Sequence, residues 1–182
     1  MLKELETRIL DIDVDYIRKK ANELNMEKVK IENQINRIYD FADMRLLKSK
    51  GYARIRTVED MINNKTVHYM TTKQMLSQEK YKIMKEHETI IESSDEGENI
   101  FMALGLQLKQ SIKKYRESYR YKSTLIEIDI NEESFCPFPY IEIETANEEE
   151  LKEVVGLLGY KMEDTTSKTI YEILKDRGVR GL

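Results

Sequence analysis

Cysteine, histidine, proline and tryptophan are scarce in this chain. Its 182 residues include one cysteine, two histidines, two prolines and no tryptophan. With Cys136 alone no internal disulfide can form, which suits a reducing compartment. An apolar run long enough for a signal peptide or a membrane span is also missing, and charges begin at Lys3 and Glu4. We therefore expect a cytoplasmic protein that does not act in a membrane.

The chain has no excess of positive charge. Its 30 basic residues stand against 34 acidic ones, and the formal net charge is -4. This balance gives no general attraction to nucleic acid or to an anionic membrane, so we expect neither as a partner, and any basic site must be local. Hydrophobic residues make up 40% of the sequence. That is enough for the core of a single domain over residues 1–182.

Two short segments carry paired carboxylates. Glu4 and Glu6 are followed by Arg8 near the N-terminus, and Glu142 and Glu144 form a second pair near the C-terminus. Because residues i and i+2 of a strand share a face, each segment places two carboxylates side by side. Ionised carboxylates repel at this spacing, and a hard cation such as Mg²⁺ or Mn²⁺ relieves the repulsion through oxygen ligands. The two pairs predict a divalent-metal site.

Hydrophobic periodicity predicts mostly strands, with a few helices. The expected strands cover residues 2–10, 28–41, 52–58, 66–73, 80–91, 106–121, 124–130 and 140–145. The expected helices cover about 13–24, 93–105, 147–159 and 166–175, and residues 44–51 are expected to form a connection. We expect Ile100, Phe101 and Leu104 to face inward, and Asn147 with Glu150 to form a capping box.

The polar faces of the predicted strands each carry charges mostly of one sign. They hold Glu4 and Glu6, Arg54 and Arg56, Lys80 and Lys82, Lys114 with Arg116 and Arg120, Glu127 and Asp129, and Glu142 and Glu144. A solvated open sheet is the alternative explanation, but such a surface is more stable when neighbouring signs differ. If the faces point inward, the ends of the chain form an acidic half and its middle forms a basic half. A metal-bound triphosphate matches both halves.

Taken in this order, the motifs resemble those of the CYTH proteins, also called triphosphate tunnel metalloenzymes. That family includes class IV adenylate cyclases, thiamine triphosphatases and inorganic triphosphatases. The similarity runs nearly end to end and takes in Glu4-x-Glu6-x-Arg8, Gln34, Arg37, Tyr39-Asp40, Arg54-Ile-Arg56, Lys73, Lys114-x-Arg116, Asp129, Glu142-x-Glu144 and Tyr171-Glu-Ile-Leu. The resemblance implies an α+β fold, in which an eight-stranded antiparallel β-barrel with open ends encloses a charged tunnel and helices pack outside.

The resemblance also implies residue roles. One or two Mg²⁺ or Mn²⁺ ions would be held by Glu4, Glu6, Asp129, Glu142 and Glu144. The triphosphate would be held by Arg54, Arg56, Lys73, Lys82, Lys114 and Arg116. Glu4, Glu6 and Arg8 would be catalytic. Arg120 and Glu127 share the inward parity and are further candidates, and the register between Lys80 and Glu88 could shift by two residues.

One position departs from the family pattern. The third charged residue of the opening motif is a lysine in the family and is Arg8 here. Arginine keeps the charge but cannot act as a titratable amine near neutral pH. We therefore expect Arg8 to order neighbouring carboxylates or to offset phosphate charge.

Three functions are compatible with these residues. We favour a metal-dependent hydrolase of inorganic triphosphate, ATP or thiamine triphosphate, acting as a monomer or homodimer. A class IV adenylate cyclase, which forms cyclic AMP and pyrophosphate, needs the same phosphate and metal ligands, but no residue that seats adenine can be named from the sequence. A non-catalytic polyanion-binding module is disfavoured, because five acidic groups in the cavity would weaken anion binding.

Overall fold

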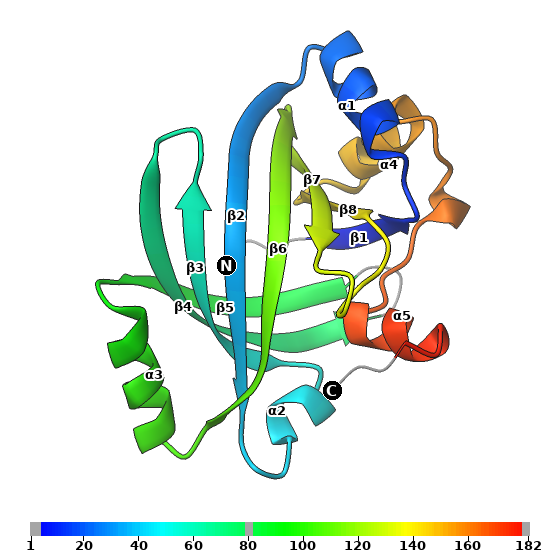
Figure 1. Ribbon diagram of the computed structural model, residues 1–182. Coiled ribbons are helices and arrows are strands. Elements are labelled where there is room, and N and C mark those ends of the chain that lie inside the picture. The colour runs from blue at the N-terminus through cyan, green and yellow to red at the C-terminus, as the bar shows by residue number, and fades with distance from the viewer. Residues whose placement is uncertain (1–4, 79–81, 180–182) are drawn as a thin grey trace.

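Eight antiparallel strands form a closed barrel in the computed structural model, which describes residues 5–78 and 82–179 (Figure 1). The strands are β1 (Leu5–Leu10), β2 (Glu27–Asp40), β3 (Tyr52–Asp60), β4 (Lys65–Gln78), β5 (Lys82–Ile91), β6 (Gln107–Tyr121), β7 (Thr124–Asn131) and β8 (Tyr140–Thr145). Around the barrel their order is β1-β5-β4-β3-β2-β6-β7-β8. The eight-stranded fold expected from the sequence is confirmed.

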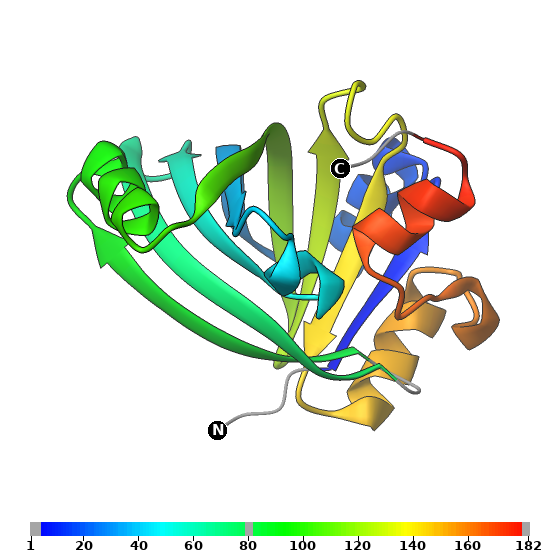
Figure 2. The ribbon, with the colours of Figure 1, turned by 90° about the horizontal axis from the view of Figure 1, so that it is seen from below.

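Helices pack around the outside of this barrel (Figure 2). They are α1 (Val14–Glu23), α2 (Arg45–Lys48), α3 (Ser94–Ala103), α4 (Glu148–Leu157), the 3-10 helix η1 (Met162–Asp164) and α5 (Ile170–Asp176). Asp13 begins α1 by accepting hydrogen bonds from the backbone N–H groups of Asp15 and Tyr16, as expected of an N-cap. No helix within the described ranges is both long enough and apolar enough to cross a membrane.

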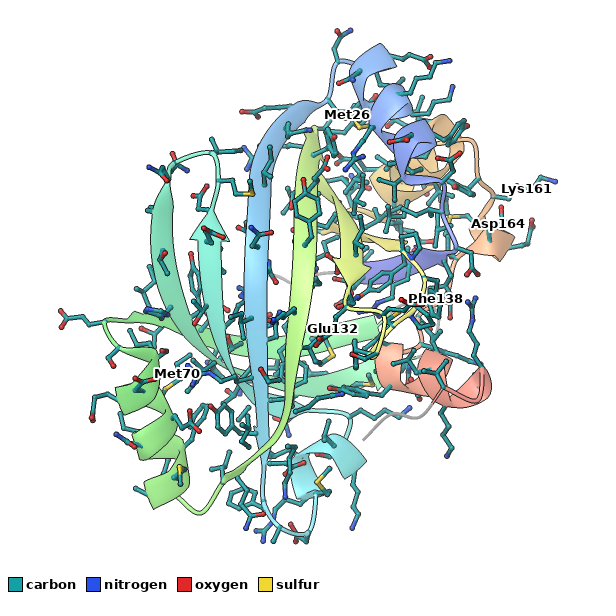
Figure 3. All side chains as sticks on the ribbon, in the orientation of Figure 1. Met26, Met70, Glu132, Phe138, Lys161 and Asp164 are labelled. Atoms are coloured by element: carbon teal, nitrogen blue, oxygen red, sulfur yellow. The ribbon has the colours of Figure 1, made fainter. Side chains whose placement is uncertain are left out.

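Two of the three hydrophobic clusters among the described residues lie between the barrel wall and these helices, and the third lies where α5 meets the barrel interior. One lies at α1 and α4 and includes Ile17, Ile126 and Leu151, with Met26 at its edge (Figure 3). Another surrounds Phe101 of α3 and has Met70 packed against it. Outward-facing apolar residues are covered in this way, and the inward face of the strands carries charged residues together with apolar ones such as Ile38 and Ile112.

Helix α3 buries a narrower face than the sequence suggested. Phe101 is buried, but Ile100 and Leu104 are 51% and 66% exposed, so the expectation that all three face inward was wrong. Gly97 is the reason, because a Cβ there would lie only 2.5 Å from Cδ1 of Ile91. The helix approaches the barrel along Gly97 and Phe101, one turn apart, which rotates Ile100 toward solvent.

Three further boundaries differ from expectation, and one of them is the end of β4, which runs on to Gln78 rather than stopping at Lys73. The connection at residues 44–51 contains the short helix α2, and the last helix begins at Ile170 rather than near Thr166. Thr166 is held in an isolated β-bridge, in which its backbone exchanges two hydrogen bonds of 2.9 Å with Arg8. The capping box at α4 is incomplete, because Asn147 caps the helix while the Glu150 carboxylate accepts from Ser123 instead.

Candidate active site

Strand register brings the two ends of the chain together inside the barrel. Glu6 of β1 lies directly opposite Glu144 of β8, and Arg8 lies opposite Glu142. On the other side of β8, Glu142 lies opposite Glu127 of β7. Directly opposed residues have neighbouring side chains. The pairing therefore collects four carboxylates and one guanidinium on one wall of the interior.

Three of these carboxylates converge on one point. Oxygens of Glu127, Glu142 and Glu144 all lie within 4.8 Å of one another. Burial, together with the charges of Glu127 and Glu6, raises the pKa of Glu144 to about 8. Three crowded carboxylate oxygens fit the preference of a hard divalent cation. Glu127, a further candidate from strand parity alone, thus belongs to the cluster that we call the carboxylate trio.

Arg8 is hydrogen-bonded to two of the carboxylates on this wall. Its guanidinium donates to Oε1 of Glu6 at 2.5 Å, to Oε1 of Glu142, and to the backbone carbonyl of Lys168 at 2.9 Å. Burial disfavours its charge, but Glu142 and Glu6 outweigh burial and raise the pKa of Arg8. Arg8 is therefore a fixed cation that orients two carboxylates.

Asp129, which the family resemblance implied as a metal ligand, pairs with two cations of β6. It is fully buried and accepts from Arg116 at 2.6 Å and from Lys114 at 2.9 Å. Arg116 also contacts Glu127, and Glu142 at 2.9 Å. Asp129 does not belong to the carboxylate trio. Its contacts instead orient the two cations of β6.

The opposite wall carries cations of β3 and β4 beside carboxylates of β5. Arg54 lies 3.7 Å from Glu86 and 3.5 Å from Glu88, Arg56 lies 3.0 Å from Glu88, and Lys73 lies 2.8 Å from Glu86. Burial disfavours the Lys73 ammonium, but acidic neighbours that include Glu86 raise its pKa. All three cations line the interior cavity.

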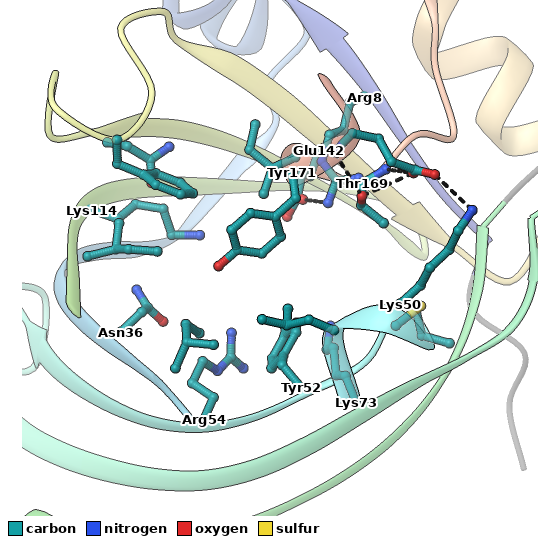
Figure 4. A pocket seen from close by; sticks show the side chains of 18 of the residues that line it. Arg8, Asn36, Lys50, Tyr52, Arg54, Lys73, Lys114, Glu142, Thr169 and Tyr171 are labelled. Carbon is teal, nitrogen blue, oxygen red and sulfur yellow. Dashed lines mark hydrogen bonds and ion pairs between the residues drawn. The ribbon is translucent and has the colours of Figure 1, made fainter. Parts of the chain in front are cut away.

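A cavity of about 890 Å³ lies between the two walls (Figure 4). Its charged lining includes Glu6, Arg8, Lys30, Lys50, Arg54, Arg56, Lys73, Glu86, Lys114, Arg116, Glu127, Glu142 and Glu144. Aromatic and aliphatic side chains also line it, and Tyr171 projects into the space between Arg54 and Glu142. Gly51 brings the segment after α2 against β4, since a Cβ there would lie 2.5 Å from the carbonyl oxygen of Lys73. The cavity is therefore charged on two sides and apolar on part of the remainder.

Most residues singled out from the sequence meet in this cavity. Glu4 and the side chain of Lys82 lie outside the described residues, although β5 pairs Lys82 with Glu6. Arg120 does not line the cavity; its side chain is 53% exposed and lies 3.8 Å from Glu27.

Several lining residues were missed from the sequence. They include Lys30, Asn36, Lys50, Glu86 and Tyr171. Strand alternation is the signal that could have found Lys30, Asn36 and Glu86, whereas Lys50 and Tyr171 come from the α2 segment and α5, which reach the cavity only through tertiary packing.

Comparisons with known proteins agree with this architecture. The family model for the CYTH domain matches residues 2–170. A search of curated proteins gives no match. Among solved structures, the PH1819 protein of Pyrococcus horikoshii OT3 is 24% identical with a TM-score of 0.78, over 96% of this chain and 99% of that one. A putative adenylate cyclase from Vibrio parahaemolyticus is 16% identical with a TM-score of 0.75, over 95% and 98%.

A third similar structure is described with an activity. A putative adenylyl cyclase from Hippeastrum, reported to have a dominant triphosphatase activity, is 17% identical with a TM-score of 0.64, over 98% of this chain and 89% of that one. These identities establish likeness of fold. The family match over residues 2–170 shows that the chain belongs to the CYTH domain family.

Proposed function

We propose that this CYTH domain protein is a divalent-metal-dependent triphosphatase that binds its substrate inside the barrel. The observation that carries the proposal is the cavity of about 890 Å³, in which the carboxylate trio faces buried arginines and lysines. A triphosphate with its metal ion carries both kinds of charge that this lining complements. We further propose a cytoplasmic location, which the buried free thiol of Cys136 supports.

The acidic wall would hold the metal. Glu127, Glu142 and Glu144 supply oxygen ligands, with Glu6 beside them and Glu4 proposed from the family motif. When bound there, Mg²⁺ or Mn²⁺ supplies charge neutralisation for phosphoryl transfer. Arg8 holds Glu6 and Glu142 in place through its hydrogen bonds, so the carboxylates are positioned before a cation arrives.

The basic residues would hold the phosphates. Arg54, Arg56 and Lys73 approach from one wall, and Lys114 and Arg116 from β6. The buried Nε–H donors of Arg54 and Arg56 have no hydrogen-bond partner among the residues that the structure describes. A buried donor without a partner is costly, and phosphate oxygens are suitable acceptors. The open donors therefore support anion binding at this wall.

One observation favours an organic triphosphate, and with it the adenylate cyclase as a second candidate. Tyr52, Phe135 and Tyr171 line the cavity beside the cations. The buried Oδ1 of Asn36 lies in the same lining and has no partner within the described part of the chain. Aromatic rings with one open acceptor suit a heterocycle that carries a donor. Inorganic triphosphate would leave these groups unused.

The decisive experiment measures phosphate and pyrophosphate released from inorganic triphosphate, ATP and thiamine triphosphate with Mg²⁺ or Mn²⁺. We expect metal-dependent phosphate release that Glu142→Gln abolishes and that Glu133→Gln, a control in the loop before β8, leaves unchanged. Cyclic AMP with pyrophosphate would support the cyclase instead. Tight binding of triphosphate with no product would identify a polyanion-binding module, against which the carboxylate trio argues.

A further inference from the structure

Two carboxylates of β5 pair with the arginines that are proposed to bind the phosphates. Oε2 of Glu88 accepts from Oγ1 of Thr71 at 2.7 Å, from Arg56 at 3.0 Å and from Arg54 at 3.5 Å. Glu86 approaches Arg54 at 3.7 Å from the same strand. One carboxylate oxygen thus meets three donors, as a phosphoryl oxygen does in a phosphate site.

A binding site for a polyanion gains nothing from fixed negative charges beside its arginines. Glu88 and Glu86 would repel a phosphate held by Arg54, Arg56 and Lys73 if they stayed in place. Their side chains are 28% and 30% exposed, in contrast to those of Glu127 and Glu142, which are buried, so solvent can receive them when they leave. The contacts to Arg54 are long, and its Nε–H stays open. The pairing is therefore of a kind that a better acceptor can replace.

We propose that Glu88, assisted by Glu86, is a displaceable internal counter-ion of the phosphate-binding arginines. It occupies Arg54 and Arg56 in the free protein, leaves when phosphate binds, and returns to compete with bound product. This inference rests on the proposed function for the identity of the ligand. Glu88 acts through the arginines and is a positioning residue rather than a catalytic one.

Competition of this kind has a defined kinetic consequence. Because Glu88 and phosphate contend for the same two guanidinium groups, the carboxylate weakens the binding of substrate and product alike. Removing its charge strengthens both, so KM falls, and kcat also falls when product release becomes slower. A residue that merely stabilised the barrel would not lower KM.

The test compares Glu88→Gln with the unaltered protein by calorimetric titration of tripolyphosphate and of inorganic phosphate, with EDTA present. Glutamine keeps an acceptor for Thr71 but removes the charge, and we expect both affinities to rise about tenfold or more. Glu59→Gln is the matched control, since it removes one charge from a residue whose carboxylate accepts from Asn33 and which does not line the cavity. If Glu88→Gln does not fold, Glu86→Gln, which frees Lys73 instead, should show a smaller gain of the same sign.

Unchanged or weaker phosphate binding in these variants would overturn the inference, because Glu88 would then be holding the arginines in their binding geometry. Under turnover, we expect KM and kcat of Glu88→Gln to fall together. The binding experiment keeps the two proposals apart. If Glu88→Gln binds phosphate more tightly but no turnover is found, the triphosphatase proposal is wrong and the counter-ion role of Glu88 is supported. If turnover is found but the affinity is unchanged, the triphosphatase proposal is supported and the counter-ion role is wrong.

Discussion

Arg8 and Glu142 lie directly opposite each other on β1 and β8, and their side chains are hydrogen-bonded in the barrel interior. The same guanidinium reaches the carbonyl of Lys168 at 2.9 Å, in the segment that leads to α5. This cation therefore links the acidic wall to the segment before the last helix. It does so without any need to lose a proton, since burial is outweighed by Glu142 and Glu6 and its pKa is raised.

The first prediction concerns Arg8→Lys. A lysine keeps the charge beside Glu6 and Glu142 but lacks the planar fork that reaches the Lys168 carbonyl at the same time. We expect turnover to stay within about tenfold of the natural protein, a difference of roughly 1.4 kcal/mol. The measurement is a pH–rate profile of both proteins. A gain of orders of magnitude, with a new ionisation only in the lysine variant, would show that this position serves as a proton acceptor.

A second prediction follows from the raised pKa of Glu144. Because burial and its carboxylate neighbours hold that pKa at about 8, the carboxyl is protonated in the metal-free protein at neutral pH. A metal ligand must be deprotonated, so Mn²⁺ affinity should rise with pH up to about 8 and then level off. Calorimetric titration in buffers of different ionisation enthalpy should show a proton released on binding at pH 7. Affinity that does not vary between pH 6 and 9 would contradict the assignment.

The same group sets the pH dependence of metal-free stability. The pKa of Glu144 is 4.5 in the unfolded chain and about 8 in the folded protein. At a pH between these two values, the unfolded chain has lost a proton that the folded protein keeps. Stability from Glu144 is therefore fully present below pH 4.5 and is lost as pH rises through 8. In EDTA, Glu144→Gln should show a smaller fall of the thermal midpoint between pH 5 and 8 than the natural protein. An identical fall in both proteins would exclude Glu144 as its source.

Glu117, on the outer face of β6, should give a pH dependence of stability opposite to that of Glu144. Burial alone would raise its pKa, but hydrogen bonds from Arg18, Tyr119, Tyr115 and Lys28 lower it to about 2. Its stabilisation is present above pH 4.5 and is lost as pH falls toward 2. Urea unfolding at pH 7 should show Glu117→Gln less stable by roughly 2–3 kcal/mol. The difference should shrink at pH 3, and a constant difference would disprove the electrostatic origin.

Strand parity predicted much of the fold and much of the site. It marked Glu6, Arg54, Arg116 and Glu142 as sharing one side of their strands, and all four line the cavity. Alternation is a local property of the backbone, so it can be read without knowing which strands are neighbours. The resemblance to the CYTH family then supplied the closure of the barrel, which no local pattern encodes.

The missed features depend on distances between segments. Asp129 has the same parity as Glu127, yet it pairs with Lys114 and Arg116 while Glu127 joins the carboxylate trio. Both carboxylates contact Arg116, but Asp129 lies directly opposite it in the register of β6 against β7 and accepts two of its hydrogen bonds. Tyr171 enters the cavity because α5 packs there, and its sequence pattern carries no sign of that.

The last prediction separates two arginines that the sequence treated alike. Arg54 is buried, but its contacts to Glu88 and Glu86 are long, at 3.5 Å and 3.7 Å, and these two carboxylates are partly exposed and can turn to solvent without it. Arg54→Ala should therefore fold normally and weaken triphosphate binding about tenfold or more, through loss of a charge-assisted contact.

Arg116 is instead surrounded by buried carboxylates of Glu127, Asp129 and Glu142. Removing it leaves buried negative charge uncompensated, so Arg116→Ala should lower the free energy of unfolding by about 3–5 kcal/mol as well as abolish turnover. The measurement is urea unfolding of both variants, first in EDTA and then in the presence of Mg²⁺. Added Mg²⁺ should partly restore the stability of Arg116→Ala, because it binds the uncompensated carboxylates of the folded protein. It should leave the stability of Arg54→Ala unchanged. Equal stability of both variants in EDTA would mean that the carboxylate trio is stable without the positive charge of Arg116. The proposal that the trio binds a metal ion would then lose its electrostatic basis.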